Sequence, residues 1–282
     1  MKALYFDCFS GISGDMTIGA LLDLGIDKDE FEKELSKINV DGYTLTHGRT
    51  KKNGISAYDF DVILEHDHHH EHEGHNHNHE HEEHHHHHGH EGHDHHHTHI
   101  EEHSHSHHHE HIHRNLYDVN KIIDDSEISE NAKDLAKRIF LRVAKAESKV
   151  HNETLENVHF HEVGAIDSIV DIIGVAICID MLKPEKIFSS VVNDGHGFIK
   201  CQHGIIPVPV PATAEIFADS NVIFKQVDVE NELVTPTGAA IIAELAESYG
   251  IMPAMNIQKV GFGAGKKDFE IPNILRVTMG EI

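Results

Sequence analysis

Two histidines and three carboxylates in one short segment have the residue types of a metal site. His159 and His161 alternate along a predicted strand, so they face the same side, and Glu162, a candidate catalytic residue, follows at the turn. Asp167 and Asp171 lie four residues apart and share one face of the next, mostly apolar helix. Like charges on a buried helix are unfavourable unless a cation or hydrogen-bond donors meet them. The segment therefore indicates a metal site, and helix capping with scattered salt bridges is the alternative.

A glycine-rich turn near the amino terminus has the composition of an anion site. An apolar strand ends at Asp7 and a helix is predicted to start near Asp15, so backbone N–H groups and a positive helix end face the turn. The candidate anion-binding residues are Ser10, Gly11, Ser13 and Gly14. Asp7 and Asp15 could act as catalytic residues that hold a cation beside the anion; a tight turn with an Asp cap is the alternative. A haloacid-type phosphatase needs a second Asp where this chain has Phe9, and no Walker lysine follows the glycines.

Two further segments place polar groups beside glycine. Glycines flank His196 and His203, so the backbone can approach a ligand closely there. His196 is a candidate catalytic residue, while Cys201 and His203 are either metal ligands or simply packed residues. The candidate phosphate-binding residues at the start of a later predicted helix are Thr235, Thr237 and Gly238. Their hydroxyl and N–H groups suit a phosphate, or an ordinary N-cap.

Residues 66–113 are rich in histidine. They hold 27 of the 33 histidines, eleven acidic residues and no lysine or arginine. The densest run is His84, His85, His86, His87 and His88. Neutral imidazole binds nickel, copper, zinc and cobalt, and many overlapping weak sites suit storage and hand-off rather than catalysis. The affinity order favours copper over nickel at such sites, so the segment indicates a class of ion and does not name nickel.

The remaining residues predict a mixed α+β (α/β) core in which helices pack on an open sheet. The core comprises residues 1–65 and 114–282, as one domain or as two subdomains, 1–150 and 151–282. Residues 66–113 have too few apolar side chains to offset their ordering entropy, so they are predicted to be a disordered insertion. Strands are predicted over 4–6, 43–49, 56–64, 157–161, 187–192, 256–263 and 274–280. Helices are predicted over 15–24, 27–38, 117–124, 127–150, 164–182 and 237–248, with a short one from 212.

Composition excludes several classes of protein. The net charge is −25 with histidine neutral, which is unlike the basic stripe of a nucleic-acid-binding protein. Three cysteines have no paired spacing, and Cys178, inside an apolar helix, is expected in the core. The longest apolar stretch contains three aspartates, too polar for a membrane span, and the amino terminus has no signal-peptide pattern. We expect a cytoplasmic protein that binds neither nucleic acid nor membrane.

Taken together, these motifs resemble the nickel-insertion proteins of nickel-pincer cofactor biosynthesis, the LarC family. The resemblance covers residues 4–16, 159–171, 195–197, 207–211, 233–238, 261–265 and 272–276, and an internal histidine-rich stretch is a family trait. It implies insertion of Ni²⁺ into pyridinium-3,5-bisthiocarboxylic acid mononucleotide, forming nickel–sulfur and nickel–carbon bonds at the expense of CTP. It also implies an enzyme of the lyase class, a nickel chelatase whose product serves lactate racemase-type enzymes.

The length of the chain departs from the family pattern. Full-length LarC members continue into a carboxy-terminal domain that handles CTP, whereas this sequence ends at Ile282. The resemblance therefore implies that CTP, with Mg²⁺ or Mn²⁺, is used through a carboxy-terminal LarC-type partner. A homo-oligomer and an apo lactate racemase-like acceptor are also expected. Two other functions stay open: a nickel metallochaperone or store without catalysis, and a metal-dependent phosphohydrolase that uses Asp7 and Asp15.

Overall fold

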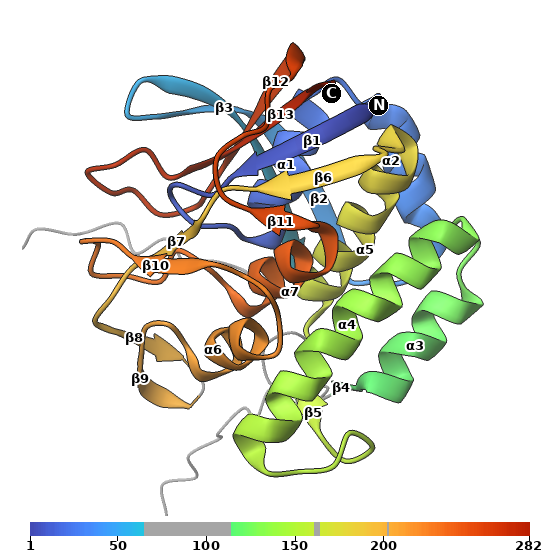
Figure 1. Ribbon diagram of the computed structural model, residues 1–282. Coiled ribbons are helices and arrows are strands. Elements are labelled where there is room, and N and C mark those ends of the chain that lie inside the picture. Colours follow the sequence, from blue (N-terminus) through green and yellow to red (C-terminus); the bar gives the residue numbers. More distant parts are fainter. Residues whose placement is uncertain (65–113, 161–163, 202) are drawn as a thin grey trace, which may run out of the picture. The chain divides into compact units, whose positions relative to one another are not determined.

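A seven-stranded mixed sheet forms the centre of the computed structural model, which describes residues 1–64, 114–160, 164–201 and 203–282. Its strands lie in the order β11-β6-β1-β13-β12-β3-β2 (Figure 1). They are β1 Lys2–Asp7, β2 Tyr43–Lys52, β3 Ile55–Leu64, β6 Lys186–Ser189, β11 Ser248–Tyr249, β12 Asn256–Ala264 and β13 Ile274–Glu281. The short strands outside this sheet are β4 Arg114–Asn115, β5 His159–Phe160, β7 Val192–Asp194, β8 Phe198–Cys201, β9 Gly204–Pro207 and β10 Phe224–Gln226.

Both parallel and antiparallel pairs occur in the sheet. β1 runs parallel to β6 and antiparallel to β13, with Leu4 opposite Ile187 and Met279. β2 and β3 form a hairpin whose turn residues Asn53 and Gly54 both have positive φ, the conformation that an Asn-Gly hairpin turn requires. Strand β1 reads as a nearly continuous apolar run, and Ala3, Leu4, Tyr5 and Phe6 are all buried, as in a strand that is covered on both faces of the sheet.

The helices are layered on the sheet. Their bounds are α1 Gly14–Asp23, α2 Lys28–Leu35, η1 Ser36–Ile38, α3 Leu116–Asp125, α4 Glu130–His151, α5 Ile166–Leu182, α6 Pro211–Ala218 and α7 Pro236–Leu245. α1 packs on β12 and β3, α5 packs on α1, and α4 packs on α5, α6 and α7. Figure 1 shows α3 and α4 further from the sheet than α1. The apolar side chains of α5 are almost all buried, so this helix forms the middle of the core.

The predicted α+β class is confirmed, and most predicted elements appear within a few residues of their expected bounds. The strand predicted over 187–192 is divided between β6 and β7. Ser190 N–H donates to the carbonyl of Phe6 in β1 at 2.8 Å, whereas Val192 N–H donates to the carbonyl of Ile223 at 2.9 Å. The strand predicted over 157–161 is limited, in the described part, to the two residues of β5. The hairpin of β8 and β9 was not predicted, because glycine and proline interrupt its pattern. The predicted insertion over 66–113 lies outside the described residues.

Within the described ranges, no helix combines the length and the apolar character needed to cross a membrane. Cys178 is fully buried in α5, as predicted for a core residue.

Candidate metal and anion site

Three helices begin around one cavity of about 320 Å³. Ser13, Gly14 and Asp15 line it from α1, Asp167, Ser168 and Asp171 from α5, and Thr235, Pro236 and Thr237 from α7. Asp61 of β3, Glu232 and Lys266 complete the lining together with Val62. Five separate parts of the sequence therefore bring five carboxylates and one lysine to the same place.

Two loops before α1 and α7 hold these helix starts together. Ile12 N–H donates to the carbonyl of Leu233 at 3.0 Å, and Thr235 N–H donates to the carbonyl of Ile12 at 3.3 Å. Gly238 allows this approach, since an added Cβ there would lie 2.9 Å from the Cα of Ser13. The predicted phosphate-binding residues of the two turns are thus placed next to each other.

A buried carboxylate fixes the second of these loops. Asp194 Oδ1 accepts hydrogen bonds from the N–H groups of Gly195 at 2.8 Å, Leu233 at 2.8 Å and Val234 at 3.1 Å. Burial raises the pKa of Asp194, and the three N–H donors oppose that rise. The side chain therefore positions the chain that leads into Thr235 and α7.

The ends of the three helices differ in how their N–H groups are satisfied. Thr235 Oγ1 accepts from Gly238 N–H at 3.1 Å, so this residue is an ordinary N-cap. The N-cap residues of α1 and α5, Ser13 and Ala165, make no side-chain hydrogen bond to the helix. The first N–H groups of a helix bind anions favourably, so the amino-terminal ends of α1 and α5 are candidate anion-binding groups.

Asp171 is the carboxylate with the most perturbed surroundings. Its Oδ1 atom is buried and has no hydrogen-bond partner among the described residues. Burial first, and then the charges of Asp15 and Asp167, raise the pKa of Asp171 well above its ordinary value. The unpartnered oxygen and the like charges both destabilise the ionised carboxylate. A cation between these carboxylates would offset both effects, because it would bind the oxygen and neutralise part of the negative charge.

Asp15 shares this environment. The Ser13 hydroxyl donates a hydrogen bond to Asp15 Oδ1. Burial raises the pKa of Asp15; that hydrogen bond and the charge of Lys266 oppose the rise, while Asp61 adds to it. Asp15 and Asp171 are therefore two acids in one cavity whose protons are held more tightly than usual.

Lys266 is the one cation in the described lining of the cavity. Its Nζ donates to Asp59 Oδ1 at 2.7 Å and to the carbonyl of Phe60 at 2.8 Å, and it lies 3.3 Å from Asp61 Oδ2. Burial alone would lower the pKa of Lys266, but the bond to Asp59 and the nearby charges of Asp15 and Asp61 raise it. The lysine stays charged and can meet an anionic group in the cavity.

The structure brings Asp15, Asp167 and Asp171 together with the residues of the two turns, but it places other predicted residues elsewhere. Asp7 forms an ion pair with Arg276 and does not line the cavity. His196 Nε2 lies 3.0 Å from Asp228 Oδ1, and His159 is exposed on β5. Ser10 and Gly11 are buried and do not line the cavity. His161, Glu162 and the run His84, His85, His86, His87 and His88 lie outside the described residues.

Two lining residues were missed from the sequence. Asp61 alternates with buried Phe60 in the predicted strand over 56–64, and Lys266 follows the glycine-rich segment 261–265 but was not itself selected as a site residue. Asp61 reaches the cavity because β3 packs on α1 and α5, and Lys266 follows β12, which pairs with β3. In the described ranges, no three His, Cys, Asp or Glu side chains already stand in a metal-binding arrangement.

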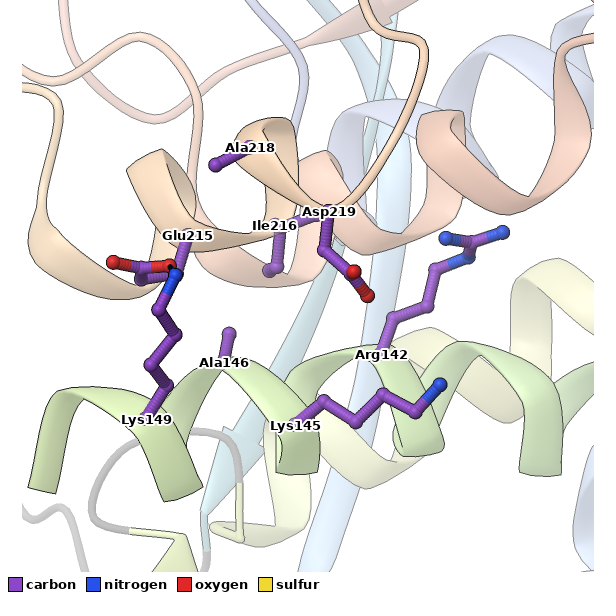
Figure 2. Close-up of a pocket in the computed structure, with 8 residues that line it drawn as sticks. All are labelled: Arg142, Lys145, Ala146, Lys149, Glu215, Ile216, Ala218 and Asp219. Carbon is purple, nitrogen blue, oxygen red and sulfur yellow. Dashed lines mark ion pairs between the residues drawn. The ribbon is translucent and has the colours of Figure 1, made fainter. Parts of the chain in front are cut away.

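A second cavity of about 310 Å³ lies between α4 and α6 (Figure 2). Arg142, Lys145 and Lys149 of α4 line it together with Glu215 of α6 and Asp219, and Lys149 reaches toward Glu215. Lys149 forms an ion pair with Glu215, and Arg142 Nε donates to Glu244 Oε2 at 2.6 Å. These ion pairs join α4 to α6 and α7, and the acidic partners leave this cavity little excess charge for a ligand.

Comparison with known proteins gives a family match over nearly the whole chain. Residues 4–282 match the family described as "Nickel insertion protein". A pyridinium-3,5-bisthiocarboxylic acid mononucleotide nickel insertion protein of Acetivibrio thermocellus is 48% identical over 99% of this chain and 60% of its own length. Proteins with the same name from Clostridium acetobutylicum and Alkaliphilus metalliredigens are 48% and 46% identical, over 64% and 60% of their lengths. The chain thus spans about three fifths of these relatives. No solved structure matches.

Proposed function

Because this chain belongs to the family of nickel insertion proteins, we propose that it binds Ni²⁺ in the cavity where α1, α5 and α7 begin and inserts it into a pyridinium mononucleotide. The relatives are named for pyridinium-3,5-bisthiocarboxylic acid mononucleotide, and we propose the same substrate here. Nickel is the cargo of this reaction. A cavity of about 320 Å³ falls in the size range of small-molecule sites, which is roughly 300–1,000 Å³.

The single observation that carries the proposal is the unpartnered, buried Oδ1 of Asp171 among like charges. Such a carboxylate is costly to keep unless a cation binds it for part of the working cycle. Asp15 and Asp167 line the same cavity and could supply further oxygen donors. Oxygen ligands hold Ni²⁺ less tightly than sulfur does, which suits a site that must release its ion.

The substrate's phosphate has a complementary place in the cavity. The ends of α1 and α5 lack side-chain caps, and Lys266 supplies a positive charge nearby. A phosphate bound there would place the pyridinium ring beside Asp15 and Asp171. The cation between the carboxylates would offset the repulsion between these acids and the phosphate.

The chemistry then proceeds by ligand replacement and proton transfer. The two thiocarboxylate sulfurs replace carboxylate oxygens on nickel, because sulfur is the softer donor. The ring carbon between them loses its hydrogen: the C–H electron pair becomes the nickel–carbon bond, and the proton passes to a carboxylate. We assign this base role to Asp171, whose carboxylate becomes available when a thiocarboxylate sulfur replaces it on nickel.

The enzyme class, the use of CTP and the acceptor of the product are proposed from the resemblance to the LarC family. We propose that the enzyme is of the lyase class, that CTP with Mg²⁺ or Mn²⁺ is used through a carboxy-terminal LarC-type portion, and that an apo lactate racemase-like enzyme receives the product. Metal storage without catalysis would need the histidine-rich residues 66–113 but not the carboxylates at the helix starts. Nickel insertion therefore requires Asp171, whereas metal storage does not.

The test is direct product formation. The chain is incubated with the thiolated mononucleotide, Ni²⁺ and CTP, with and without a carboxy-terminal LarC-type piece, and mass spectrometry detects the metallated product. The proposal expects product from the wild type, and none from Asp171→Asn. Asp180→Asn is the matched control, since Asp180 lies on the same helix but bonds to Ser129 and Asn131 outside the cavity. Full product from Asp171→Asn would refute the proposed site.

A further inference from the structure

The loop between β12 and β13, residues 265–273, carries Lys266 to the acidic cavity and is held by the tip of the β2–β3 hairpin. Lys52, the last residue of β2, donates from Nζ to the carbonyls of Lys266 and Lys267 at 3.2 and 3.4 Å. It also donates to Asp268 Oδ1 at 2.7 Å. An ammonium group has three donors, so those of Lys52 are all used on three consecutive residues of this loop.

Lys52 is also the one buried lysine in the part of the chain that the structure describes, with 8% of its surface exposed. A buried charge is costly unless hydrogen bonds satisfy it, and lysine is seldom buried. The side chain of Asp268 stays 82% exposed, so solvent weakens the ion pair between the two residues. The two backbone carbonyls therefore indicate what the burial of Lys52 achieves, which is to fix the path of the chain at Lys266.

Two asparagines fix the same loop further along. Asn53, in the turn of the hairpin, donates from Nδ2 to the carbonyls of Phe269 and Glu270 at 3.2 and 2.8 Å. Asn273 Nδ2 donates to the carbonyl of Lys267 at 2.9 Å. Together with the three bonds of the buried ammonium group, six side-chain hydrogen bonds hold five consecutive residues of the loop.

The other face of the loop contacts two walls of the acidic cavity. The ammonium group of Lys266 lies against β3, where it bonds to Asp59 and to the carbonyl of Phe60. Lys267 Nζ donates to Asn231 Oδ1 at 2.7 Å, in the chain that leads into α7. A binding site needs its charged groups held within about 0.5 Å of their place. A displaced loop would therefore misplace the positive charge relative to the helix starts.

We propose that Lys52 is a positioning residue for nickel insertion, which fixes the backbone at Lys266 so that this lysine meets the phosphate of the mononucleotide. The inference rests on the proposed function, because it needs that phosphate to bind in the acidic cavity. Lys52 does not line the cavity and acts only through the loop. Its loss should therefore weaken binding of the mononucleotide and leave the rate of the bound complex unchanged.

Isothermal titration calorimetry of the full chain with the thiolated mononucleotide tests this role. We expect Lys52→Met to raise Kd about tenfold, with the stoichiometry of binding unchanged. A merely structural role would lower the folded fraction, and with it the stoichiometry, while Kd stayed the same. Lys51→Met is the matched control, because Lys51 precedes Lys52 in β2, carries the same charge and is exposed, so its Kd should equal that of the wild type.

A second variant keeps the test open if Lys52→Met does not fold. Asn53→Gly preserves the turn, because Asn53 has a φ of 53-residue numbering's left-handed region at 51° that glycine adopts freely. It removes two of the six hydrogen bonds that hold the loop. We expect a rise in Kd for the mononucleotide in this variant too, again with unchanged stoichiometry.

A double-mutant cycle shows whether Lys52 acts through Lys266. If it does, the variant with both Lys52→Met and Lys266→Met binds the mononucleotide no more weakly than Lys266→Met alone. Additive losses, or a normal Kd in both Lys52→Met and Asn53→Gly, would overturn the proposal and leave the phosphate site intact. A normal Kd in Lys266→Met would refute the phosphate site and this role of Lys52 together. The nickel site would still stand or fall on product formation by Asp171→Asn.

Discussion

Gly14 lies directly against Asp171. A Cβ added to Gly14 would stand 2.6 Å from the Cβ of Asp171 and 2.7 Å from its Cγ, closer than side chains approach one another. The first residue of α1 therefore touches the carboxylate on the second turn of α5 without any intervening side chain. This contact determines how close Asp15 and Asp171 come, and so how strongly the two acids compete for one proton or one cation.

Gly14→Ala should disturb this contact. Overpacking of a close contact costs about 1–3 kcal/mol of unfolding free energy, and the start of α1 must move away from α5. Urea unfolding measures the change. Gly48→Ala is the matched control, because no atom lies within 4 Å of its added Cβ, and its effect should stay within about 0.5 kcal/mol. Equal stability of the two variants would contradict the close packing of Gly14 on Asp171.

Asp171→Asn should make the protein more stable at neutral pH. The pKa of Asp171 in the fold is raised well above 3.8, so the folded state favours the protonated acid. The protonated acid therefore contributes to the free energy of unfolding. This contribution is fully present below the pKa of Asp171 in the unfolded state and is lost as the pH rises through its pKa in the folded state. Asparagine does not titrate and shows no such loss. The difference in unfolding free energy between the variant and the wild type should therefore grow by up to about 1.4 kcal/mol for each pH unit between the two pKa values.

Urea unfolding at a series of pH values, from about 4 to 8, measures this difference. Asp180→Asn lies on the same helix and should show no such growth, because Ser129 and Asn131 donate hydrogen bonds to its carboxylate at 2.7 and 3.0 Å. A difference between Asp171→Asn and wild type that stays constant with pH would show that burial does not perturb Asp171.

Asp194→Ala should loosen the loop that leads into α7. Three backbone N–H groups would lose their acceptor, and each buried donor left without one costs about 1–3 kcal/mol. Thermal unfolding should show a large loss of stability, with hydrogen exchange faster at Leu233 and Val234. Asp194→Asn is the control, because its amide oxygen can still accept all three bonds. Full retention of stability in Asp194→Ala would contradict a role of this acceptor oxygen in holding the loop.

Lys266→Met should weaken binding of the mononucleotide. A charged hydrogen bond contributes about 1.5–3 kcal/mol, so KM for the substrate should rise roughly tenfold to a hundredfold. Lys259→Met removes a charge from the neighbouring part of β12, outside the cavity, and should leave KM unchanged. Kinetics by mass spectrometry compare the two variants. A normal KM in Lys266→Met would place the phosphate elsewhere.

The sequence predicted much of this arrangement because its signals are local. Asp15 follows a glycine turn, and Asp167 and Asp171 repeat at helical spacing, so their elements could be assigned without knowledge of the fold. Asp61 and Lys266 could not be predicted, since the packing of β3 on α1 and α5 and the pairing of β12 with β3 bring them to the helix starts. His159 was expected to face the carboxylates. In the structure it is exposed on β5, while neighbouring Phe160 fills the core.

Anomalous diffraction at the nickel absorption edge, from crystals of the chain soaked in a nickel salt, tests the central claim most directly. We predict a nickel peak in the cavity between Asp15, Asp167 and Asp171, with Asp171 Oδ1 among its ligands. Peaks found only at histidine-rich positions, with these three carboxylates unchanged and no metal between them, would contradict the account.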